Sequence, residues 1–220
     1  MNDSPASDTL DKDAALRDAI DGVRRLIELT VTAEPSHDAL AAAAHHVAQA
    51  VAALEPFRRA TRRREGPATL ADREPATLMP FDPVVGRFSP LAPPLHVRWE
   101  PPNAVGEVTF TPPYEGPPGC VHGGLIAAAF DQVFNVANLM LGSPGPTASL
   151  QLNYRQPTPL GVPLRFEGWQ ERVDGRRVHV RGRLLAGDRV TVDAEGVFVV
   201  VPVERILAML APGSEGERDR

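Results

Sequence analysis

Residues 120–141 read CVHGGLIAAAFDQVFNVANLML, a long apolar run in which Asp131 is the only charged side chain. Its length predicts a helix, and its apolar character on most sides predicts that the rest of the fold surrounds it. Polar side chains across its middle, Gln132, Asn135 and Asn138, argue against a membrane span. A carboxylate in an apolar helix is costly unless it is solvated, paired or used in chemistry. Asp131 is therefore the first candidate for a functional residue.

Strand patterns flank this helix on both sides. Six segments carry apolar residues at every second position, two before the helix and four after it. The expected strands are 95–99, 104–111, 147–156, 162–173, 177–186 and 189–201. Each has one apolar side and one side that water can reach, which is typical of an antiparallel sheet. The predicted fold class is α+β, with an antiparallel sheet wrapped around one long central helix.

The N-terminal part of the chain predicts a helical extension. Apolar residues recur at a helical spacing over 9–31, and Ser36 can cap a second helix that runs to about Arg64. Residues 65–94 are rich in proline and glycine, which predicts a connection draped over the surface. The expected division of the chain is a helical extension at 1–64, this connection at 65–94, the sheet domain at 95–202, and a C-terminal turn with a charged tail at 203–220.

The amino-acid composition limits which binding partners and which cellular compartment are expected. A formal net charge of −5 over 220 residues does not favour nucleic acid. The single cysteine, Cys120, excludes an intrachain disulfide framework and suits a reducing compartment. The acidic first 15 residues lack the pattern of a signal peptide, and the six histidines lack metal-ligand spacing. We expect a cytoplasmic protein with no metal site, no nucleic-acid partner and no membrane span.

The start of the apolar helix is a second chemical feature. In His122-Gly123-Gly124 the glycines lack a Cβ, so a ligand can approach the backbone closely. Free N–H groups of a first helical turn can bind an anion or polarise a carbonyl. Asp131 lies about 14 Å further along the helix axis and on the opposite side from His122. A site that uses both features therefore needs a second copy of the helix, which predicts a symmetric homodimer with two composite sites.

One stripe of small and polar residues follows the helix at steps of four and three, which indicates a cleft or close approach by another chain. It comprises Gly124, Ala128, Asp131, Asn135 and Asn138. Asp131 also has a purely structural interpretation, in which it bonds only to nearby backbone or to Asn135. A thiol nucleophile at Cys120 is disfavoured because no separate orienting acid is evident, and a packed thiol fits better.

The run from Leu91 to Val201 closely resembles the hotdog-fold acyl-CoA thioesterases, in particular the PaaI-like and THEM4-like branch and its actinobacterial members. The motifs that carry the resemblance are YEGPPGCVHGGLIAAAFDQ at 114–132 and TASLQLNYRQPTPLG at 147–161. Their spacing is specific: His-Gly-Gly, an aspartate nine residues after the histidine, and a threonine sixteen after the aspartate. The resemblance implies a hotdog fold, an acyl-CoA or other acyl-thioester substrate, a homodimer or homotetramer, and no cofactor.

The resemblance also implies roles for individual residues. Asp131 matches the nucleophile or general base, and Gly123 matches the glycine of the opposite subunit whose N–H polarises the thioester carbonyl. His122 matches the histidine that shapes this loop and contacts the carbonyl, and Thr147 the hydroxyl that holds the attacking water. Substrate contacts are expected at Gly124, Asn135, Asn138 and Arg155. Basic segments at 58–64 and 176–183, like Arg155, are candidates to meet the phosphates of coenzyme A.

Three function classes stay open on this reasoning. The first is an acyl-CoA thioesterase. The second is a non-catalytic acyl-CoA-binding or regulatory hotdog protein, which a displaced Asp131 or Gly123 would favour. The third is a hydratase or dehydratase on the same fold, but the motif that pairs a histidine with an acid in those enzymes is not present. The acyl group, the carrier and the role of residues 1–90 are left open.

Overall fold

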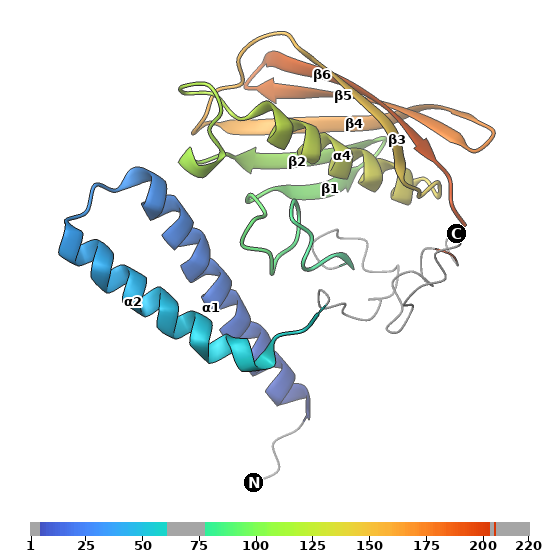
Figure 1. Ribbon diagram of the computed structural model, residues 1–220. Helices are drawn as coiled ribbons and strands as arrows, with labels where there is room; N and C mark the ends of the chain where they lie inside the picture. Colours follow the sequence, from blue (N-terminus) through green and yellow to red (C-terminus); the bar gives the residue numbers. More distant parts are fainter. Residues whose placement is uncertain (1–4, 61–77, 203–204, 206–220) are drawn as a thin grey trace, which may run out of the picture.

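A computed structural model of the 220-residue chain describes residues 5–60, 78–202 and 205. A sheet covers a central helix, and two N-terminal helices lie beside this domain (Figure 1). The helices are α1 (Pro5–Thr32), α2 (His37–Leu54) and α4 (Gly123–Met140), with short 3₁₀ turns η1 (Glu55–Phe57) and η2 (Pro112–Tyr114). The strands are β1 (His96–Glu100), β2 (Asn103–Thr109), β3 (Thr147–Tyr154), β4 (Pro163–Asp174), β5 (Arg177–Ala186) and β6 (Arg189–Val199).

The strands of the described chain form one antiparallel sheet in the order β1-β2-β4-β5-β6-β3. Gly175 and Gly187, with φ of +56° and +60°, close the β4–β5 and β5–β6 hairpins, because these turns need a residue that tolerates positive φ. After α4 the chain returns to pair β3 with β6, so β3 lies at one end of the sheet. This arrangement confirms the α+β prediction and is a hotdog fold, with a helix held by a curved sheet.

The core lies between α4 and the concave face of the sheet. Phe130 and Phe134 of α4 are fully buried and contact Phe166 of β4 and Phe198 of β6, with ring centroids 5.0 and 6.3 Å apart. Burying one such side chain contributes about 1.5–3 kcal/mol. The sheet thereby covers the apolar sides of α4, as its sequence predicted.

Small residues cross the sheet beneath α4 and let the helix approach the strand backbones. Gly168 of β4 pairs with Gly182 of β5, and the row continues to Ala104 of β2 and Ala194 of β6. A Cβ on Gly168 would lie 2.8 Å from a methyl carbon of Val133. Glycine inside a strand often marks such a close approach. The row therefore sets how deeply α4 sits in the sheet.

We expect Gly182→Ala to destabilise the protein by about 1–3 kcal/mol, the usual cost of overpacking a core. Its Cβ would lie 2.5 Å from the Glu167 carbonyl oxygen and 2.8 Å from the Phe134 ring, and a backbone atom cannot move aside cheaply. Gly22→Ala on exposed α1 is the matched control, because a Cβ there meets nothing within 4 Å. Thermal unfolding followed by circular dichroism measures both variants, and an unchanged Tm for Gly182→Ala would contradict the role of the row.

Two expectations about the first 94 residues need correction. The second helix ends at Leu54 and not near Arg64, because Pro56 in η1 has no N–H to continue the helix. The connection is more than surface chain, since Val85 and Phe88 are buried in the core.

The predicted cap of the second helix is confirmed: Ser36 caps α2 and accepts the Ala39 N–H at 3.3 Å. Residues 61–77 of these segments, and most of the turn expected after residue 202, lie outside the described residues.

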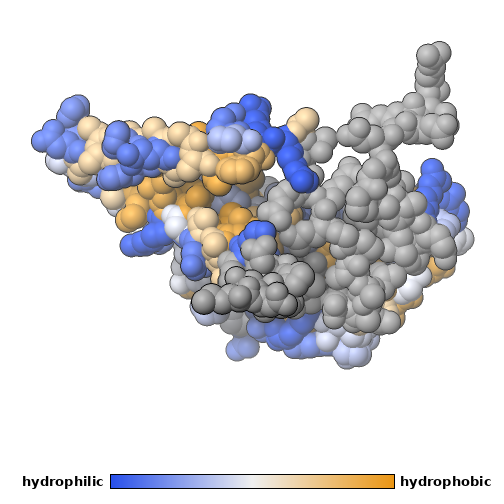
Figure 2. Space-filling view, turned by 90° about the horizontal axis from the view of Figure 1, so that it is seen from below, coloured by the Kyte–Doolittle hydropathy of each residue, from blue (hydrophilic) through white to orange (hydrophobic). Residues whose placement is uncertain are grey.

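The helical extension contacts the domain through α1 and leaves α2 exposed. Arg24 of α1 donates to the Ser89 carbonyl at 2.9 Å. No residue of α2 is buried, and apolar side chains on it, such as Val51 and Leu54, face outward. Figure 2 shows apolar residues on the surface of this extension. Within the described part of the chain, no helix has both the length and the apolar character that crossing a membrane requires.

Candidate active site

The His-Gly-Gly sequence forms the N-terminus of α4. His122 is the N-cap, with φ −62° and ψ 126°, and its Nδ1 accepts the Gly124 N–H at 3.0 Å. A ring that accepts through Nδ1 carries its proton on Nε2. The N–H of Gly123 makes no hydrogen bond with any residue that the structure describes. The helix start therefore presents one free backbone donor, reinforced by the positive end of the helix dipole.

Tyr154, at the end of β3, packs over this helix start. Its hydroxyl donates to the Gly123 carbonyl at 2.8 Å. A Cβ on Gly123 would lie 3.0 Å from that hydroxyl oxygen, so the glycine makes room for the tyrosine. Tyr154 was not among the site residues expected from the sequence, although it lies within the motif at 147–161. Its even spacing from the apolar Leu150 and Leu152 is the signal that it faces the helix.

Asp131 forms a second polar cluster on α4. Thr147 Oγ1 donates to Asp131 Oδ1 at 2.5 Å, and Asn135 Nδ2 donates to Oδ2 at 3.4 Å. Both carboxylate oxygens thus have a donor, which holds the side chain in one orientation. In the single chain Asp131 is half-buried and Thr147 is exposed. The apolar sequence around Asp131 predicted a buried acid, but the side chain is only half-buried and lies at the surface of the chain.

A β-bulge aims the Thr147 hydroxyl at this carboxylate. The pairing of β3 with β6 shifts register between Thr147 and Ser149. Leu150 and Leu152 pack on the core, and Tyr154 continues on the same side. Without the bulge, Thr147 would point away from the helix, because it is an odd number of residues from the others. The extra residue of the bulge restores its direction toward α4.

The expected substrate contacts fall into different environments. Gly124 lies under the His122 ring, and Asn135 contacts Asp131. Asn138 is fully buried, and its Oδ1 accepts a hydrogen bond from Gln170 at 3.0 Å. The structure therefore brings Gly124 and Asn135 to the two polar clusters and places Asn138 in the core.

The candidate basic residues are largely engaged within the chain. Arg155 forms an ion pair with Asp193 of β6. On the 176–183 segment, Arg181 pairs with Glu171 at 3.1 Å and Arg183 with Glu167 at 2.7 Å. Of the 58–64 segment only Arg58 to Ala60 are described, and Arg58 pairs with Glu55 at 3.4 Å. These arginines balance acidic neighbours on the surface.

The two polar clusters lie at opposite ends of β3. Thr147 is the first residue of the strand and Tyr154 is the last. Asp131 is eight residues after Gly123 on α4, about 12 Å further along the helix axis, so within one chain its carboxylate is out of reach of the Gly123 N–H. Neither cluster has both an acid and a free carbonyl-binding donor.

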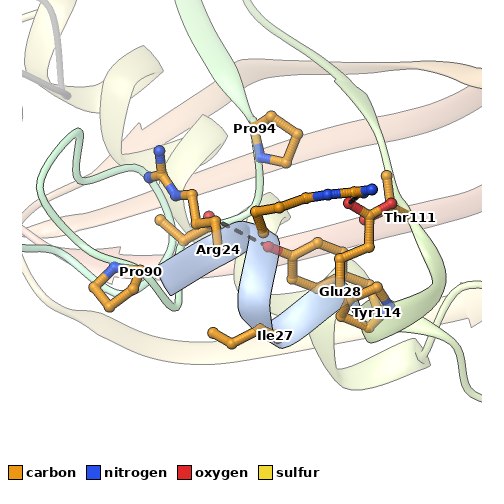
Figure 3. A pocket seen from close by; sticks show the side chains of 10 residues that line it. Arg24, Ile27, Glu28, Pro90, Pro94, Thr111 and Tyr114 are labelled. Atoms are coloured by element: carbon orange, nitrogen blue, oxygen red, sulfur yellow. Dashed lines mark hydrogen bonds and ion pairs between the residues drawn. The ribbon is translucent and has the colours of Figure 1, made fainter. Parts of the chain in front are cut away.

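The structure also has a cavity outside the two polar clusters, and it contains none of their side chains. It has a volume of about 240 Å³ and lies between α1 and the proline-rich loops (Figure 3). Arg24 and Glu28 of α1 line one wall, and Tyr114 lines another, with its hydroxyl donating to the Ala92 carbonyl at 3.3 Å. None of the residues expected to be catalytic contributes to it. The residues expected to be catalytic lie instead at the two ends of β3.

Comparison with known proteins shows to which protein family this chain belongs. Residues 118–192 match the family model described as thioesterase superfamily. A crystal structure described as a thioesterase superfamily protein is 34% identical, with a TM-score of 0.73, over 84% of this chain and 94% of that one. The chain belongs to the thioesterase superfamily. Because residues 65–220 are only about 71% of its length, this match also includes part of the N-terminal extension.

A named relative is similar over a shorter stretch. The acyl-coenzyme A thioesterase THEM4 of Xenopus laevis is 31% identical over 90 residues. These residues are 40% of this chain and 40% of that protein, so well under half of the relative is matched. Together with the family model, this similarity supports thioester hydrolysis as the general chemistry and confirms the resemblance found in the sequence.

Proposed function

We propose that this protein hydrolyses acyl-coenzyme A, or another acyl thioester, to a free acid and a thiol, at a site shared by two subunits. The observation that carries the proposal is the Thr147–Asp131 hydrogen bond of 2.5 Å, which orients a carboxylate at the surface of the subunit. The similarity to a relative named as an acyl-coenzyme A thioesterase supports coenzyme A as the carrier. The superfamily supports the reaction class.

The exposed edge of β3 supports the shared site. Strand β6 pairs with one edge of β3, and the other edge has no partner strand among the described residues. An exposed edge of this kind is a template for pairing with another chain. Antiparallel pairing with a second β3, about a two-fold axis near Gln151, would bring the Thr147 end of one strand beside the Tyr154 end of the other. Asp131 would then face the Gly123 N–H of the partner subunit.

The chemistry of this arrangement is complete without a further group. The thioester carbonyl oxygen accepts the free Gly123 N–H, which stabilises the negative charge that develops on this oxygen. Asp131 removes a proton from water as the water oxygen bonds to the carbonyl carbon. The carbon–sulfur bond then breaks, and the thiolate leaves and takes up a proton. Direct attack by the carboxylate, followed by hydrolysis of the anhydride, uses the same groups.

We expect Thr147→Val to lower kcat about 10- to 100-fold, the value of a hydrogen bond to a charged group. Valine keeps the branched shape on the strand but has no hydroxyl to orient Asp131. Thr147→Ser is the matched control, because it retains the hydroxyl and is expected to keep most of the activity. Thiol release from an acyl-CoA substrate measures both. Equal rates for the valine and serine variants would show that the hydroxyl has no role.

The test of the function is hydrolysis of a panel of acyl-CoA substrates with short, long and aromatic acyl groups, followed by thiol release. The expected result is turnover of at least one class. Light scattering of the same sample is expected to show a dimer or a larger assembly. Saturable binding of acyl-CoA with no thiol release would instead identify the non-catalytic binding protein, and a monomer that turns over substrate would exclude the shared site.

A further inference from the structure

One peptide group at the start of α4 is held at both of its polar atoms. The carbonyl oxygen of Gly123 and the N–H of Gly124 belong to the same peptide unit. Tyr154 donates to this oxygen at 2.8 Å, and the Nδ1 of His122 accepts from this N–H at 3.0 Å. Hydrogen bonds on opposite sides of one peptide polarise each other and fix its plane.

The orientation of this peptide matters because the adjacent candidate donor, the free N–H, belongs to Gly123. A glycine backbone samples a wider range of φ and ψ than any other residue, so Gly123 alone would let its N–H swing. The adjacent residue is also glycine, and the region is the exposed end of a helix. The His122 contact restrains only the N–H side of the peptide. The Tyr154 hydroxyl restrains the carbonyl side, and it does so from a different element, strand β3.

We propose that Tyr154 is a positioning residue, whose hydroxyl holds the Gly123–Gly124 peptide so that the Gly123 N–H points at the thioester carbonyl. This role rests on the proposed function for the identity of the carbonyl. Tyr154 itself contacts the backbone of Gly123 and needs no contact with substrate.

The protonation state of Tyr154 suits this role. Partial burial against the helix start raises the pKa of Tyr154 above its ordinary value. A phenol with a raised pKa stays protonated through the neutral range, so it remains a donor to the Gly123 carbonyl.

The test begins with Tyr154→Phe, which removes the hydroxyl and keeps the ring. We expect kcat to fall about 3- to 10-fold with KM within about twofold, because a neutral hydrogen bond of this kind has a modest net value. Tyr114→Phe is the matched control. It also removes a tyrosine hydroxyl that donates to a backbone carbonyl, that of Ala92, but on the α1 side of the domain. It is expected to leave kcat unchanged.

A double-mutant cycle separates positioning from packing. On a Gly123→Pro background the N–H is absent, so Tyr154→Phe is expected to cause no further loss of kcat. The same fold loss on both backgrounds would overturn the proposal, because a tyrosine that only packs would act equally in each.

Amide hydrogen exchange gives a readout that does not depend on turnover. Tyr154→Phe is expected to accelerate exchange at Gly124, whose peptide loses one of its two anchors. Unchanged exchange at Gly124 would overturn the positioning role even if the enzyme hydrolyses thioesters. Wild-type protein without hydrolysis would overturn the proposed function, whereas faster exchange in the variant would still support the structural effect of Tyr154.

Discussion

Replacing Asp131 with asparagine is expected to lower thioester hydrolysis about 100- to 10,000-fold, the usual contribution of a general base. Asparagine has nearly the same shape, but its amide neither takes a proton from water at neutral pH nor attacks a carbonyl carbon. Its side-chain oxygen can still accept the Thr147 hydroxyl that now bonds Asp131. The geometry of the site is therefore retained while its chemistry is removed.

The fold is expected to tolerate this change. Asp131 is half-buried and lies at the surface of the chain, so removing its charge leaves no buried group without a partner. Thiol release measures kcat, and thermal unfolding shows whether the variant is as stable as the wild type. Asp188→Asn is the control: this carboxylate lies on the exposed β5–β6 turn, and its loss is expected to leave turnover unchanged. Turnover of Asp131→Asn at the wild-type rate would contradict a catalytic role for Asp131.

The architecture was predictable because its signals are local and periodic. Alternating apolar residues placed the strands within two residues of their observed ends, and the apolar run placed α4. The sequence identifies the His-Gly-Gly start and Asp131 as candidates, because glycine and a charged residue are unusual in an apolar helix. Periodicity did not show that Val85 and Phe88 enter the core, since the connection that carries them has no regular spacing.

Contacts between the helix and the edge strand were not predictable in the same way. The hydrogen bond from Thr147 to Asp131 depends on the bulge between Thr147 and Ser149, which no alternating pattern reveals. The Tyr154 contact depends on where β3 lies relative to α4. Asn138 shared a stripe with Asp131 on an ideal helix, but the sheet covers its end of that stripe. The sequence shows which residues share one face of a helix, whereas tertiary packing decides which part of that face is buried.

Gly123→Pro is expected to lower kcat about 100- to 1,000-fold, the cost of removing one donor to a developing oxyanion. Proline has no N–H, and Gly123 is the first residue of α4, where proline is well tolerated. His122 has ψ of 126°, the extended conformation that a residue before proline prefers. No intrachain hydrogen bond among the described residues is lost, because the Gly123 N–H has no partner there. The substitution therefore removes the donor with little change to the helix.

Gly123→Ala is the matched control for crowding. Both residues add a Cβ that would lie 3.0 Å from the Tyr154 hydroxyl oxygen, so both press on the same side chain. Only proline also removes the N–H. The difference in kcat between the two variants isolates the donor, and similar kcat values for alanine and proline would attribute the effect to crowding.

Mixing the two inactive variants then tests whether each site is shared. If Asp131 works with the Gly123 of the partner subunit, a mixed dimer of Asp131→Asn and Gly123→Pro chains has one intact site and one doubly defective site. Equimolar mixing with free exchange of subunits is expected to restore about a quarter of wild-type activity, since half of the dimers are mixed and each has one working site of two. A site contained in one chain gives a different result, because every chain in the mixture then has a defective site. Recovery of activity on mixing therefore requires that the acid and the donor come from different subunits.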